Sequence, residues 1–141
     1  MTDPTTTVDP LRRDDDASVQ RVFLSDERVA GIRILAESLG YTVFDADVTG
    51  CHDKAGLLER LARAMSFPDW FGANWDAWFD CLSDLGWHAA APGYVLVVRG
   101  GLGMQRTAPE TFDTALAIVE DAARVWADRG VILRAFVDLE T

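Results

Sequence analysis

The chain has 141 residues, of which 23 are acidic and 13 are basic, so its formal net charge is −10. This length suits a single domain with one core, and a chain of this charge repels phosphate backbones, which argues against direct binding to nucleic acid. No run of residues is long and apolar enough to span a bilayer, and the start, MTDPTTTVDP, lacks the pattern of a signal peptide. We therefore expect a cytoplasmic protein with no membrane contact.

The first 17 residues differ in composition from the rest of the chain. They are rich in Thr, Asp and Pro and have no apolar period, so we predict an acidic disordered tail over residues 1–17 and a single domain over residues 18–141. The domain opens with a β–α unit at residues 18–40. Its strand is predicted at Val19–Leu24, and Asp26 is the predicted cap of a helix that stops at Gly40.

Short apolar runs alternate with helical patterns along the rest of the domain. Further strands are predicted at Tyr41–Ala46, Tyr94–Val98 and Val131–Val137. Helices are predicted over the leucine-rich stripe at residues 57–65, from Asn74 to about Leu85, and from a capping box at Thr107–Glu110 to Gly130. This alternation indicates an α/β fold, with a small, mostly parallel β-sheet of three to four strands covered by helices.

The helix predicted at residues 74–85 has two different faces. On a helical wheel, one face is apolar and would lie on the core, and the other carries Asp76, Phe79, Asp80, Ser83 and Asp84. Asp76 and Asp80 are one turn apart, and no Lys or Arg occurs anywhere between residues 64 and 98. Uncompensated carboxylates beside an unburied aromatic are typical of a binding site for a cationic partner, although an ordinary solvated helix surface would also be polar.

The segment before this helix, Phe67-Pro-Asp-Trp-Phe-Gly-Ala-Asn74, is a tight connection. Gly72 would allow an unusual backbone angle or the close approach of a partner. Trp70 and Phe71 cannot both be buried in so short a loop, so we expect one to pack in the core and the other to be displayed. The loop and the helix together form a candidate site for a protein partner.

The sequence supports an enzymatic function less well than a protein-binding site. Paired carboxylates such as Asp76 and Asp80 could act on a glycoside, but nothing on an exposed helix face would raise the pKa of one of them. Cys81 falls on the apolar side of its helix, which favours an inert buried thiol. The run Gly100-Gly-Leu-Gly103 lacks the third glycine of a dinucleotide-binding loop and is predicted to be a plain turn.

A metal site is not expected either. Cys51, His52 and Asp53 are consecutive, and adjacent side chains diverge on a helix or a strand. We therefore expect no metal, no cofactor and no catalysis, with a small hydrolase as the minor alternative.

The residues from Phe67 to Leu82 resemble the signature of the barstar family, the intracellular inhibitors of barnase-type ribonucleases. Proline, an aromatic pair, glycine, Asn-x-Asp-Ala and Asp-Cys-Leu keep the family's spacing, and a looser resemblance runs from about Tyr41 to Val137. It implies a protein that plugs, one-to-one, the active site of a basic, extracellular-type ribonuclease. We also expect the free protein to be a monomer. An immunity protein for a different toxin nuclease is the alternative.

The resemblance also implies roles for single residues. Asp80 would mimic an RNA phosphate and meet the catalytic basic cluster, and Asp76 would meet a second basic residue. Trp70 stands where the family has a tyrosine that covers a catalytic histidine, and Phe79 where it usually has a larger aromatic. The remaining contacts are expected at Gly72, Asn74 and Ser83.

One contact of the family has no firm place in this sequence. The family has a further contact glutamate in its last helix. Glu120 and Asp121 are the candidates here, whereas a plain alignment counted back from Gly130 places Val125 at that position.

Overall fold

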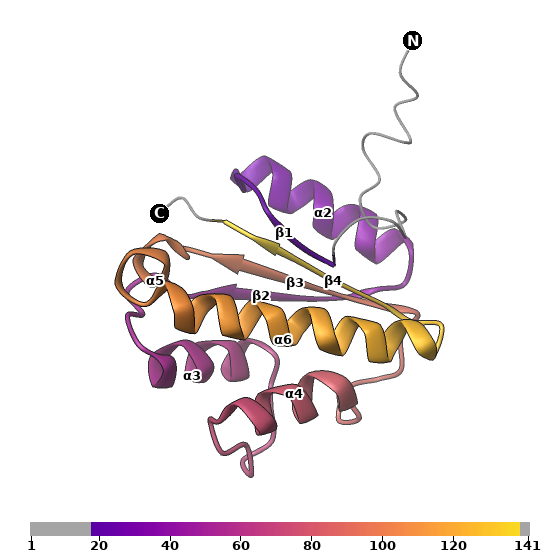
Figure 1. The fold of residues 1–141 in the computed structure, drawn as a ribbon. Coiled ribbons are helices and arrows are strands. Elements are labelled where there is room, and N and C mark those ends of the chain that lie inside the picture. Colours follow the sequence, from indigo (N-terminus) through magenta and orange to yellow (C-terminus); the bar gives the residue numbers. More distant parts are fainter. Residues whose placement is uncertain (1–17, 139–141) are drawn as a thin grey trace.

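The computed structural model of the protein describes residues 18–138 (Figure 1). The tail predicted at residues 1–17 lies outside this range. Among the described residues, no helix has both the length and the apolar character that crossing a membrane requires.

Four strands form one sheet, and every neighbouring pair is parallel. In chain order they are β1 (Val19–Arg21), β2 (Thr42–Asp47), β3 (Gly93–Arg99) and β4 (Ile132–Val137), and in the sheet their order is β1-β4-β3-β2. The predicted parallel α/β sheet is therefore confirmed. The first strand is shorter than predicted, because the chain leaves β4 after the hydrogen bond that Val22 N donates to Val137 O.

The helices lie on both faces of this sheet (Figure 1). They are α2 (Asp26–Ser38), α3 (Lys54–Ala64), α4 (Trp75–Asp84), α5 (Leu102–Thr107) and α6 (Pro109–Asp128). α2 covers one face alone, whereas α3 and α6 cover the other and α4 packs on α6. The element that carries the predicted site is thus an outer helix, held on α6.

Each face of the sheet has its own apolar core. The smaller core contains Val29, Ile32 and Ala36 of α2, packed on Val95, Val97 and Phe136 of the sheet. The larger core contains the apolar sides of α3, α4 and α6 and the alternate sheet residues, among them Leu96 and Val98. Successive residues of β3 therefore face different cores, which is why this strand reads as a continuous apolar run.

An ion-pair cluster also joins α2 to the sheet. Asp45 of β2 accepts two hydrogen bonds from Arg99 of β3, at 3.0 and 2.5 Å, and lies 3.4 Å from Arg33 of α2. The hydrogen bond to Asp45 raises the pKa of the Arg99 guanidinium above its usual value. The unit at residues 18–40 is therefore fixed to the rest of the domain by charge as well as by apolar packing.

Two predicted helix caps are wrong. The cap of α2 is Ser25, whose Oγ accepts from Arg28 N at 3.1 Å, and Asp26 is the first helical residue. Thr107 does not cap α6, because it ends the short helix α5, which the sequence did not predict, and its hydroxyl donates to Gly103 O at 2.7 Å. α6 begins instead at Pro109, without a side-chain cap.

Candidate partner-binding site

A cluster of aromatic rings fixes the loop that precedes α4. The ring of Phe67 lies 5.2 Å from that of Phe71, 5.7 Å from Trp78 and 5.6 Å from Trp87. Ser66 adopts a left-handed conformation (φ 55°), which turns the chain out of α3 and points Phe67 inward. The loop is thus attached to the core through Phe67 and Phe71.

Trp70, in contrast, is displayed. Its side chain is 63% exposed, whereas Phe71 is half-buried against the larger core. The prediction that one of these two aromatics packs and the other is displayed is confirmed. A rigid aromatic of this size on the surface is the kind of side chain that binding hot spots use.

The turn into α4 differs in detail from the prediction. The left-handed residue is Ala73 (φ 52°), and Gly72 lies outside that region, so the unusual backbone angle expected at Gly72 is not there. A Cβ on Gly72 would lie 3.1 Å from Asn74 Nδ2, so its small size leaves room for the Asn74 side chain. Asn74 caps α4 as predicted, since its Oδ1 accepts from Ala77 N at 2.8 Å.

The carboxylates of α4 share one exposed face. Asp76, Asp80 and Asp84 are all exposed, and none of them forms an ion pair within the part of the chain that the structure describes. Phe79 and Ser83, from the same side of the wheel, are half-buried. The Ser83 Oγ atom is itself buried and has no hydrogen-bond partner among residues 18–138, so in this rotamer a partner cannot reach it.

The opposite side of α4 is held on α6 by two reciprocal tryptophan hydrogen bonds. Trp78 Nε1 of α4 donates to Ala115 O of α6 at 3.1 Å, and Trp126 Nε1 of α6 donates to Leu82 O of α4 at 2.8 Å. Each buried indole N–H thereby finds an acceptor on the other helix. Their effect is to fix the rotation of α4 about its axis, and with it the direction of the carboxylates.

Cys81 lies on this packed side, as predicted. It is fully buried, and its burial, with smaller contributions from the charges of Asp80 and Asp84, raises the pKa of its thiol to about 11. The thiol is therefore protonated and unreactive at neutral pH.

Two cations contact α4, and sequence reasoning missed both. The Lys54 ammonium of α3 lies 4.6 Å from the centre of the Trp75 ring, and Arg129 Nη1 donates to Ser83 O at 2.8 Å. Both residues lie outside residues 64–98, so no local sequence pattern predicts their contacts with α4. They lie at the two ends of the helix and leave its middle acidic.

The two acidic candidates in α6 lie elsewhere. Glu120 accepts a hydrogen bond from Val19 N of β1, and Asp121 is paired with Arg124 of its own helix. Within residues 18–138, neither forms a hydrogen bond or an ion pair with α4. The structure therefore assigns neither of them to the acidic face.

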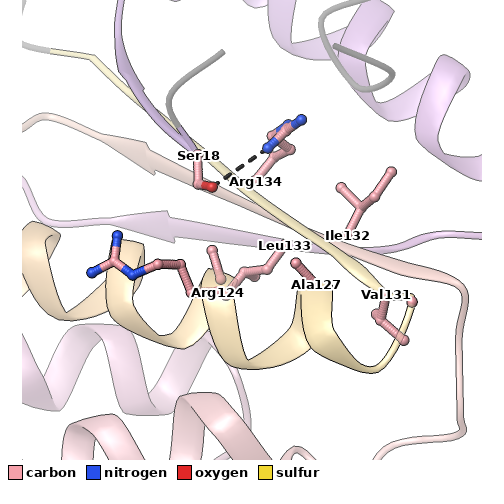
Figure 2. A pocket seen from close by; sticks show the side chains of 9 residues that line it. Ser18, Arg124, Ala127, Val131, Ile132, Leu133 and Arg134 are labelled. Atoms are coloured by element: carbon pink, nitrogen blue, oxygen red, sulfur yellow. Dashed lines mark hydrogen bonds between the residues drawn. The ribbon is translucent and has the colours of Figure 1, made fainter. Parts of the chain in front are cut away.

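Three pockets formed by residues 18–138 have no lining residue in α4 or in the loop before it. A pocket of about 530 Å³ is lined by Ser18, α6 and the start of β4, where Arg134 Nη1 donates to Ser18 Oγ (Figure 2). None of its lining residues belongs to α4 or to the loop before it. The candidate site is a protruding helix and loop, a shape suited to entering the cleft of another molecule.

Neither histidine contacts the carboxylates of α4 through a hydrogen bond or an ion pair within the described residues. His88 Nε2 lies 2.6 Å from Met65 O, and its ring packs on Phe44. His52 is an exposed neighbour of Asp53. Within residues 18–138, no three or more His, Cys, Asp and Glu side chains gather as metal ligands would.

The described residues thus form a parallel α/β domain that displays Trp70 and the acidic face of α4. A model of the barstar (barnase inhibitor) family matches residues 41–138, from the start of β2 to the end of β4. The chain therefore belongs to the barstar family, whose members are inhibitors of barnase-type ribonucleases and not enzymes. A search of curated proteins found no match. The family match leaves out β1 and α2.

Proposed function

We propose that this protein inhibits a barnase-type ribonuclease by binding it one-to-one, with α4 and the loop at residues 66–74 inserted into the active site. The observation that carries the proposal is the acidic face of α4, whose carboxylates have no ion-pair partner within the described residues. A ribonuclease binds RNA phosphates with Lys, Arg and His side chains. Carboxylates held in the same places would occupy that cluster and exclude the substrate.

The protein has the electrostatic character that such binding requires. Its net charge of −10 would steer it toward a basic enzyme and raise the association rate. The two tryptophan hydrogen bonds hold α4 in place before binding, so little conformational freedom is lost on association. Both properties favour rapid and tight binding.

Within this proposal, each site residue has a role. Asp80, at the centre of the exposed face, meets the catalytic basic cluster, and Asp76 meets a second basic residue. Trp70 covers a catalytic histidine. Phe79 and Ser83 contribute packing rather than polar contacts, since both are half-buried. Gly72 and Asn74, in the turn between Trp70 and α4, contact the enzyme.

The test compares two aspartates of the same helix. Purified wild-type protein is titrated against barnase-type ribonucleases, and inhibition should be complete at a 1:1 ratio. Asp80→Ala should then weaken binding by several kcal/mol, on the order of the 2–5 typical of a broken buried charge pair, a range drawn in part from the barnase–barstar complex. Asp84→Ala, the matched control, should cost about 1 kcal/mol or less, because a charge at the rim stays solvated.

The two outcomes that contradict the proposal are distinct. Equal losses for the two variants would refute the central position of Asp80, because a diffuse surface attraction treats both carboxylates alike. Absence of inhibition by the wild type would refute the ribonuclease as partner. In that case, nucleases from toxin proteins would be the next partners to titrate.

A further inference from the structure

Arg129 stands out among the cations near α4, because its guanidinium is held in one orientation at the end of the acidic face. It is the residue after α6, at the C-cap position, and it lies 4.9 Å over the centre of the Trp126 ring. Its Nη1 donates to Ser83 O, the carbonyl of a residue on the same side of α4 as Asp76 and Asp80. The side chain is nevertheless exposed.

The charge of Arg129 has no counter-ion in the part of the chain that the structure describes. The nearby carboxylates Asp80 and Asp84 form no ion pair with it, and its other N–H groups make no hydrogen bond to residues 18–138. A guanidinium has five N–H donors in a planar fork that matches a carboxylate. Arg129 is therefore fixed by one donor and by its stacking, with the rest of the fork facing solvent.

We propose that Arg129 binds a carboxylate on the ribonuclease and so determines which ribonuclease this protein inhibits. The inference rests on the proposed function, because it assumes that α4 enters the active site. Ser83 follows Asp80 by three residues, a helical rise of about 5 Å. The ribonuclease should accordingly carry an acidic side chain roughly 5–10 Å beyond the basic cluster that meets Asp80. An enzyme with Lys or Arg at that place would be repelled.

The competing explanation is purely structural. A cation that binds the last carbonyls of a helix stabilises it, and Arg129 could do only this for α4. The two explanations predict opposite effects of charge reversal. If Arg129 only stabilises α4, Arg129→Glu adds negative charge to a surface that faces a basic enzyme, and association becomes faster without faster dissociation. If it binds a carboxylate, Arg129→Glu sets two carboxylates against each other.

The experiment measures association and dissociation rates for full-length wild type, Arg129→Ala, Arg129→Glu and the control Arg106→Glu. Arg106 is exposed on α5 and undergoes the same charge change. The probe is the barnase-type ribonuclease that the wild type inhibits most strongly within a purified panel. Thermal melts of the free proteins show whether the two Arg129 variants lose the same stability, as removal of the bond to Ser83 O requires.

We expect Arg129→Ala to dissociate about tenfold faster and Arg129→Glu about a hundredfold faster, while Arg106→Glu dissociates like the wild type. Arg129→Glu that dissociates no faster than Arg129→Ala would overturn the inference and leave the proposed function intact. If the wild type inhibits no ribonuclease of the panel, the proposed function and this inference fall together.

Discussion

Ile32 and Ile34 allow the contribution of α2 to stability to be measured with a matched control. Both are isoleucines of the same helix, but Ile32 is 7% exposed in the smaller core and Ile34 is 69% exposed on the outer side. We predict that Ile32→Ala destabilises the whole domain strongly and that Ile34→Ala does not.

The magnitude follows from what each substitution removes. Isoleucine to alanine deletes three carbon atoms, worth about 2.4 kcal/mol of transfer free energy at ~0.8 kcal/mol each. The cavity left at Ile32 adds to this, and the better helix propensity of alanine returns a few tenths of a kcal/mol. The net loss for Ile32→Ala is therefore about 2.5–4 kcal/mol. At Ile34 only the propensity gain applies, so stability should stay the same or rise slightly.

The assay is urea unfolding of the full chain, followed by a titration against the ribonuclease. Ile32→Ala should lower the midpoint of a single transition without a change in its slope, and inhibition should remain one-to-one because α2 lies on the face of the sheet opposite α4. Equal midpoints for the two variants would refute the packing of α2 described above. Loss of inhibition by a folded Ile32→Ala protein would show that α2 acts on the binding site.

Two further predictions concern the base of α4. Cys81→Ala should lower the free energy of unfolding by about 1–2 kcal/mol and leave inhibition intact. At pH 8, mass spectrometry should show that iodoacetamide labels Cys81 far more slowly in the native protein than in urea. Fast labelling of the native protein that abolishes inhibition would contradict the buried position of Cys81. Trp126→Phe should cost about 1–3 kcal/mol in thermal unfolding, since Leu82 O loses its donor, whereas the same substitution at the exposed Trp70 should leave stability unchanged. A Trp126→Phe protein as stable as Trp70→Phe would mean that the hydrogen bond contributes nothing.

Most of the fold could be predicted because its signals are local. The apolar run Tyr94–Val98 marked β3, the periodic apolar residues of α6 marked its buried side, and Asn74 marked the start of α4. The predictions that failed include two helix caps, which depend on the conformation of the backbone just before the cap residue. Thr107 has the sequence of a cap, but α5 already occupies the preceding turn, so its hydroxyl bonds backward to Gly103 O.

The site was predictable in its composition and less so in its arrangement. The carboxylates could be placed on one exposed face because a wheel needs only the helical period. The left-handed angle is at Ala73 and not at Gly72, where a Cβ would instead lie 3.1 Å from Asn74 Nδ2. The proximity of Arg129 to Ser83 depends on how α6 crosses α4, and no pattern within either helix encodes that crossing.

The position of β3 between the two cores has a consequence for how the protein opens. Val95 and Val97 face α2, whereas Leu96 and Val98 face the helices on the other side of the sheet. Detachment of the helices from either face would therefore expose β3 to water. Backbone amides of β3, bonded within the sheet between β2 and β4, should exchange with deuterium only on global unfolding, while those of the three-residue edge strand β1 exchange through local opening. The family match begins at residue 41, yet the packing of α2 on β3 leads us to expect that residues 18–40 unfold together with the matched part of the chain.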